Sequence, residues 1–141
     1  MERTAPRSAT VGRVLGGRLL RVGALAALLS ASANAMVLTI ASSLLGAVII
    51  PPDETVTLGQ VVVASVAGSI GAAVVFAAVI GGFTRRPVRV FWGIAAVGLL
   101  LSFIPIALAG ATGSSAGTLA LMHVVTAITN VGLLTKLGRK G

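Results

Sequence analysis

The chain contains no cysteine and no tyrosine, and its 141 residues include one histidine and three acidic residues. Without cysteine there is no disulfide, no thiolate metal site and no thiol redox chemistry, which excludes the small four-span oxidoreductases that pass disulfides to quinones. One histidine without cysteine cannot supply a protein metal site of the usual composition. We therefore expect neither a metal nor another cofactor.

The scarcity of acidic residues excludes further classes of protein. Glu2, Asp53 and Glu54 all lie outside the long apolar stretches, so no carboxylate lies within a membrane span. Small four-span multidrug exporters run proton-coupled antiport on an intramembrane glutamate, which this chain lacks. A serine paired with the single histidine would have no acid to orient the ring. No class of enzyme is indicated, and the sequence favours a non-enzymatic protein.

Charged residues make up 10% of the chain and hydrophobic residues 56%, which is the balance of a membrane protein. Three stretches, 22–52, 55–84 and 90–135, contain no Asp, Glu, Lys or Arg. Each exceeds the roughly 20 residues that cross about 30 Å of hydrocarbon. The third has a Gly/Ser/Thr-rich break at 109–115 and so holds two spans. We predict an all-α four-helix transmembrane bundle with spans at about 22–46, 58–83, 90–109 and 116–136.

Local signals mark the helix ends. Pro51 and Pro52 cannot continue a helix, so they belong to a connection. Thr57 is a good N-cap for the second helix, with Gln60 placed to complete a capping box. Pro87 suits the start of the third helix, where its missing N–H costs nothing.

The basic residues predict the orientation. All eleven lie in the head at 1–21, in the turn at 84–89 and from Lys136 onward, whereas the connections on the other side carry Asp53 and Glu54. The positive-inside rule then places both termini in the cytoplasm, as expected for a bacterial inner-membrane protein. We divide the chain into a basic head (1–21), a membrane domain (22–137) and a short basic tail (137–141).

The basic residues also bear on partners. They flank apolar spans and have few aromatic neighbours for base stacking, so we expect anionic lipid headgroups, and not nucleic acid, as their partners. A rival interpretation of the first span is a cleaved signal peptide, because Ala33-Asn34-Ala35 resembles a signal-peptidase site. Cleavage would leave an apolar run at 36–50 that is too short to span, so we expect the helix to be retained.

Polar residues inside the predicted spans are few. On the fourth span His123, Thr126 and Asn130 share one face because they are three and four residues apart. Counted from the outer helix ends at 1.5 Å per residue, His123, Ser65 and Ser102 lie at roughly 10 Å, and the two asparagines at about 18 to 21 Å. The predicted polar seam or ligand cavity therefore comprises His123, Ser102, Ser65, Thr126, Asn130 and Asn34.

Two functions follow from these features. Small residues at fourfold spacing, Ala64, Gly68 and Ala72, form a helix-packing face, either within the monomer or between copies. The leading hypothesis is therefore a non-enzymatic component that associates with itself, as a homo-oligomer, or with a larger membrane complex. The alternative is a carrier or binding protein for a small apolar or weakly polar molecule near His123. A closed, filled bundle would favour the first, and a cavity ringed by Ser65, Ser102 and His123 the second.

Several short motifs occur in a specific order. They are Ile49-Ile50-Pro51-Pro52 with Thr55-Val56-Thr57-Leu58-Gly59-Gln60-Val61, Thr84-Arg85-Arg86-Pro87 with Val90-Phe91-Trp92, Leu100-Leu101-Ser102-Phe103-Ile104-Pro105, and Leu119-Ala120-Leu121-Met122-His123-Val124-Val125. Over about 22–137 the chain resembles a family of small bacterial four-span membrane proteins catalogued only as a domain of unknown function. The resemblance implies a four-helix integral membrane protein with a retained first helix. It implies no activity and no functional residues.

Overall fold

A computed structural model describes residues 7–82, 85–111 and 113–138, with side chains from residue 17 onward. Its four helices are α1 (Arg7–Leu45), α2 (Leu58–Gly81), α3 (Pro87–Leu108) and α4 (Gly113–Leu137). Each is long and apolar enough to cross a membrane, the candidate span of α1 being Gly17–Leu45. The predicted all-α architecture with four spans is confirmed, and the chain is an integral, multi-pass membrane protein.

The first helix is longer than its predicted span. It runs without interruption from Arg7 to Leu45, so the basic head from residue 7 onward is continuous with the membrane helix. No proline lies between these residues, and glycines, including the Gly16-Gly17 pair, weaken a helix without necessarily ending it. Residues 1–6 of the predicted head and 139–141 of the predicted tail lie outside the described residues.

The local end signals act as predicted. Thr57 accepts a hydrogen bond from the backbone N–H of Gln60, and the Gln60 side chain accepts from the Thr57 N–H, which completes the capping box of α2. Pro87 begins α3. Gly46, just after the end of α1, has a φ of +88°, a left-handed conformation that glycine adopts without steric cost.

The connection between α1 and α2 contains a hairpin that the sequence did not predict. Strand β1 (Ile49–Ile50) pairs antiparallel with β2 (Glu54–Thr55). The hairpin is tied to its neighbours, because the Ile49 N–H donates to Oγ of Ser115 at 3.1 Å and Nε2 of Gln60 donates to Oε1 of Glu54 at 2.7 Å. The hairpin therefore covers one end of the bundle, which we call the hairpin end.

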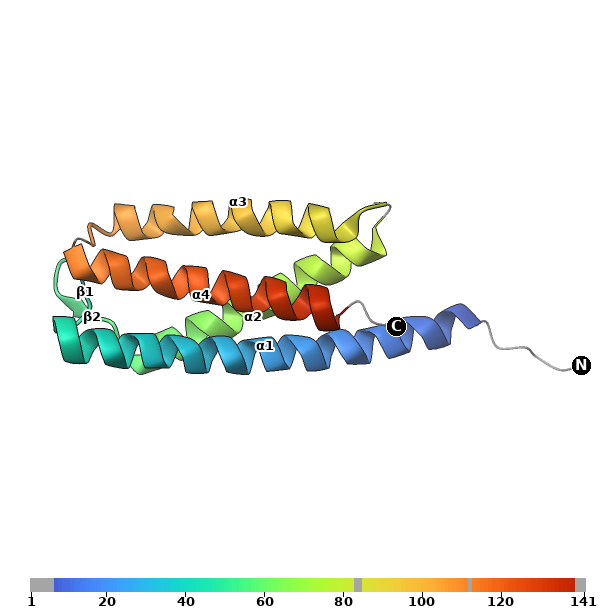
Figure 1. The fold of residues 1–141 in the computed structure, drawn as a ribbon, viewed down its shortest axis with the longest axis horizontal. Helices are drawn as coiled ribbons and strands as arrows, with labels where there is room; N and C mark the ends of the chain where they lie inside the picture. Colours follow the sequence, from blue (N-terminus) through green and yellow to red (C-terminus); the bar gives the residue numbers. More distant parts are fainter. Residues whose placement is uncertain (1–6, 83–84, 112, 139–141) are drawn as a thin grey trace, which may run out of the picture.

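Helix α2 crosses the bundle obliquely (Figure 1). Helices α1, α4 and α3 lie in that order across the molecule, with α4 packed against both of the others. Helix α2 passes behind α4, beside α1 at the hairpin end and approaching α3 at the opposite end. As a result α2 and α3 diverge toward the hairpin end.

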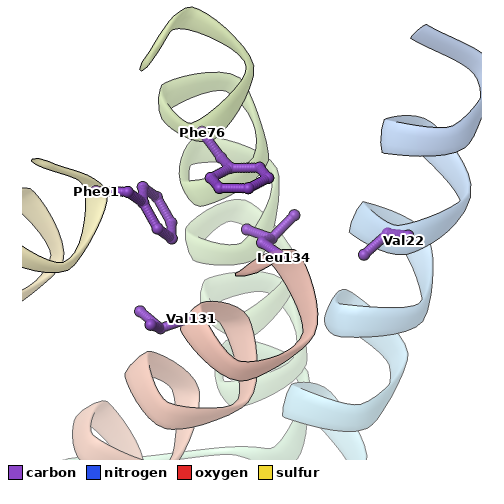
Figure 2. Packing of buried hydrophobic residues seen from close by; sticks show 5 residues of the cluster. All are labelled: Val22, Phe76, Phe91, Val131 and Leu134. Carbon is purple, nitrogen blue, oxygen red and sulfur yellow. The ribbon is translucent and has the colours of Figure 1, made fainter. Parts of the chain in front are cut away.

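Two apolar clusters hold the helices together. At the end opposite the hairpin, side chains from all four helices meet in a cluster of Val22, Phe76, Phe91, Val131 and Leu134 (Figure 2). The Phe76 and Phe91 rings pack edge to face with their centroids 4.8 Å apart. The second cluster joins α1, α2, α4 and the connection after α1, and it consists of Leu38, Ala41, Val48, Val61 and Met122.

Helix α3 is anchored at one end. Phe91 is the one buried residue of α3, all of which the structure describes, and it belongs to the first cluster. The second cluster contains no residue of α3. The rest of α3 is half-buried or exposed, and toward the hairpin end it diverges from α2, which leaves a space between the two helices.

A cavity between helices as the candidate functional site

A cavity of about 570 Å³ lies between α2 and α3. The two helices form its walls, α4 forms its floor, and α1 contributes only Asn34. No described element closes the fourth side, so the cavity opens along the surface between α2 and α3, which faces lipid in a membrane-spanning bundle. Its volume falls within the roughly 300–1,000 Å³ range of small-molecule sites.

The lining is mainly apolar. It extends from Phe91 and Val131 of the first cluster to Ile50 and Val56 beside the hairpin. No Asp, Glu, Lys or Arg lines it. A lining of this kind suits a neutral molecule, because an isolated charge in such surroundings is strongly disfavoured.

All six polar residues predicted for a seam or cavity line this one space. They come from all four helices and comprise Asn34, Ser65, Ser102, His123, Thr126 and Asn130. Gln60, predicted only as a helix cap, also lines the cavity near the hairpin. A local pattern could have signalled it, because Gln60 lies four residues before Ala64 and so shares the face of α2 that carries Ala64, Gly68 and Ala72.

Asn34 links three helices. It is 3% exposed, and its Nδ2 donates to Oγ of Ser65 on α2 at 2.9 Å and to Oγ1 of Thr126 on α4 at 2.7 Å. The predicted depths had instead grouped Ser65 with His123, and Asn34 with Asn130. Residue counts from helix ends compare depths only for parallel axes, and α2 is inclined.

Asn130 is bonded within its own helix. Its Nδ2 donates to the backbone carbonyl of Thr126 at 2.8 Å, and since a carbonyl oxygen only accepts, this bond fixes which end of the amide is free. The free end, Oδ1, is buried without a partner, as is Oδ1 of Asn34. A buried oxygen without a partner lowers stability, so each of these two amides carries one unpaired acceptor at the edge of the cavity.

His123 lines the cavity, and one of its two ring nitrogens is bonded within the helix. Its Nδ1 lies 2.7 Å from the backbone carbonyl of Leu119, and because that oxygen only accepts, the proton is on Nδ1. In the neutral ring Nε2 is then a bare acceptor, and among the described residues it has no hydrogen-bond partner. The Oδ1 atoms of Asn34 and Asn130 are completely buried. Nε2 of His123 is not among the completely buried atoms. The ring lies near Phe103, with centroids 6.3 Å apart.

The remaining predicted residues are placed as follows. The Ser102 hydroxyl donates to the carbonyl of Leu99 at 2.6 Å, so its hydrogen is not available to a ligand. The small face of α2, Ala64, Gly68 and Ala72, lines the cavity, and a Cβ at Gly68 would meet Cγ2 of Thr126 at 3.8 Å.

A close contact between α1 and α2 occurs on another face of α2. A Cβ built at Gly23 would lie 3.1 Å from Cβ of Ala73. Gly23 is buried, so the absence of a side chain there lets the two helices approach.

Comparison with known families gives one match. The model of a family described as "Family of unknown function (DUF6069)" matches residues 14–140. The chain belongs to the DUF6069 family. The resemblance inferred from the sequence motifs is confirmed, and the family description assigns no activity. No curated protein and no solved structure matches this DUF6069 chain.

The chemistry available in the DUF6069 cavity is hydrogen bonding without charge. Among the described residues no group of three His, Cys, Asp or Glu side chains is placed to hold a metal ion. His123 is the one titratable side chain in the lining, so it has no second group there with which to relay a proton. The arrangement can bind and orient a neutral molecule.

Proposed function

We propose that this DUF6069 protein is a membrane carrier or binding protein for a small apolar or weakly polar molecule held between α2 and α3. The observation that carries the proposal is the 570 Å³ cavity, whose lining includes Ser65, Ser102 and His123. A purely structural bundle needs no such space, because unfilled volume forfeits packing contacts. The open side between α2 and α3 lets the ligand enter from the acyl-chain region of the bilayer.

The proposal is tested by filling the cavity from α3. Gly98 lines it and a Cβ there would meet nothing within 4 Å, so Gly98→Phe places a ring in the space without straining the fold. Gly93 is also on α3, also has nothing within 4 Å, and does not line the cavity, so Gly93→Phe is the matched control.

The assay is the binding of tritiated 1-dodecanol to the full chain in lipid nanodiscs, with empty nanodiscs subtracted. We expect Gly98→Phe to weaken binding at least about tenfold, since it displaces the ligand from apolar contacts, and Gly93→Phe to bind like the wild type. Equal binding by wild type and the Gly98→Phe protein would place the probe outside the cavity and refute the proposal.

The second candidate function is association through helix faces, with another copy or a larger membrane complex. The exposure of α3, which buries only Phe91, favours it. It ranks second because Ala64, Gly68 and Ala72 line the cavity, so a partner helix packed on this face would have to fill the space between α2 and α3. Crosslinking and native mass spectrometry in mild detergent test it, and monomer alone with no retained partner would remove its basis.

The proposed location is the bacterial inner membrane, with both termini in the cytoplasm and the basic residues against anionic headgroups. The support is the distribution of charge, with eleven basic residues outside the hairpin end and Asp53 and Glu54 within it. A C-terminal green fluorescent protein should fluoresce. Because the chain has no cysteine, Asp53→Cys should react cleanly with an impermeant maleimide on intact cells. Labelling only after lysis would show that the hairpin end faces the cytoplasm and that the proposed orientation is wrong.

A further inference from the structure

We infer that the molecule bound in the cavity is a neutral lipid-soluble alcohol, which donates its hydroxyl hydrogen to Nε2 of His123. The inference rests on the proposed binding function and specifies its ligand. It follows from which polar atoms around the cavity are already bonded and which are accessible.

Several donors that line the cavity are committed within the protein, whereas the hydroxyls of Ser65 and Thr126 accept from Asn34 and keep their own hydrogens free of a described acceptor. Nδ1 of His123 donates to Leu119, the Ser102 hydroxyl donates to Leu99, and Nδ2 of Asn34 donates to two hydroxyls. By contrast, Nε2 of His123 has a lone pair and no partner among the described residues. A ligand that supplies a hydrogen therefore gains a bond to an acceptor that is otherwise unpaired.

Accessibility selects His123 over the other unpartnered acceptors. The Oδ1 atoms of Asn34 and Asn130 also lack partners, but both are sealed from a water-sized probe. Nε2 of His123 is not among the sealed atoms, and His123 lines the cavity beside Leu119 and Met122. A hydroxyl on an apolar body can therefore reach Nε2 while the rest of the molecule covers the apolar walls.

Charge and hydrogen-bond capacity select a hydroxyl over other donors. An ammonium group would be buried without a counter-ion, because the lining contains no carboxylate. An amide would bring both a carbonyl and an N–H out of water, whereas a hydroxyl is a smaller neutral group that supplies the one hydrogen Nε2 can accept. A single hydroxyl matches a single accessible acceptor at the lowest desolvation cost.

The test compares ligands that differ only in their polar end. 1-Dodecanol, its methyl ether, dodecane and dodecylamine compete with tritiated 1-dodecanol on the full chain in nanodiscs. We expect the alcohol to bind about five- to tenfold more tightly than the ether, the usual effect of one hydrogen bond to an otherwise unpaired acceptor. We expect the protonated amine to bind more weakly than the alcohol.

Variants locate the hydrogen bond. His123→Leu and His123→Phe both remove the acceptor but replace the ring with side chains of different shape, so at least one variant should fold. Each folded variant should bind the alcohol and the ether equally, with the affinity that the wild type has for the ether. Retained ether binding shows that the cavity is intact. Thr135→Val is the matched control on the same helix, because its hydroxyl is bonded to the carbonyl of Val131 at 2.6 Å and Thr135 does not line the cavity, and it should keep the preference for the alcohol.

Each other outcome has one meaning. If the wild type binds alcohol, ether and alkane equally, the inference is wrong and the proposed binding function stands. If none of the four binds, the proposed function itself fails. A preference for the alcohol that survives in both His123 variants, or tighter binding of the amine than of the alcohol, overturns the assignment of a neutral hydroxyl to His123.

Discussion

Gly138, at the end of α4, offers a sharp test of the packing. It is buried, and a Cβ at this position would lie 2.5 Å from the carbonyl oxygen of Leu134, 2.7 Å from Cε1 of Phe76 and 3.3 Å from Cδ2 of Leu19. Real Cβ atoms essentially never approach a neighbour within 3.0 Å, so the backbone of α4 or the Phe76 ring must move. Overpacking of this kind costs about 1–3 kcal/mol, and we expect Gly138→Ala to lower the free energy of unfolding by that amount.

Gly132 provides the matched control on the same helix. A Cβ there would meet nothing within 4 Å, so Gly132→Ala adds a methyl group without a clash. Since alanine favours a helix interior over glycine, this variant should be up to about 1 kcal/mol more stable than the wild type. The two substitutions are chemically identical and are expected to act in opposite directions.

Steric trapping in bicelles measures both free energies of unfolding without removing the chain from a bilayer. Circular dichroism checks that each variant has the helix content of the wild type before unfolding. If the Gly138→Ala protein were as stable as the Gly132→Ala protein, the contact between the end of α4, Phe76 and Leu19 would not exist as described, and the reasoning would fail.

Two further predictions concern helix ends and use the same assay. Thr57→Ala removes the capping box of α2 and should cost about 1 kcal/mol, whereas Thr57→Ser keeps the hydroxyl and should cost less; equal losses would show that the cap contributes nothing. Arg18 donates from Nε to the carbonyl of Leu137 at 2.9 Å, near the C-terminus of α4. Arg18→Met should therefore lower stability by up to about 1 kcal/mol, less at high salt, and a salt-independent loss would point to packing instead.

Helix number and most helix ends could be predicted because their signals are local. The capping box at Thr57, the proline that begins α3 and the glycine after α1 each act within a few residues of the backbone they terminate. The start of the first helix was harder to predict. The sequence becomes apolar after Arg21, but this change in polarity does not break the helix, and α1 continues through it. The hairpin was missed because strands of two residues have no periodicity to detect.

The polar residues show the limit of depth counting. The sequence places His123, Thr126 and Asn130 on one face, since residues three and four apart on a helix share a side. It could not pair Ser65 with Asn34, because that contact depends on the inclination of α2 relative to α1. Which polar residues on different helices form hydrogen bonds depends on the angle at which the helices cross. That angle is set by packing between residues elsewhere in the chain.

The amino-acid sequence was enough to predict a four-span membrane protein without charged residues, thiols or a second titratable group beside its one histidine in the spans. Those conclusions depend on composition and on patterns within single helices. The tertiary structure was needed to show that the polar residues line one cavity, and that Nδ1 of His123 is bonded to Leu119 while Nε2 has no partner among the described residues. The physical reason is that Phe91 anchors α3 at one end while α2 crosses toward α1 at the other, an arrangement fixed by contacts between residues far apart in the chain.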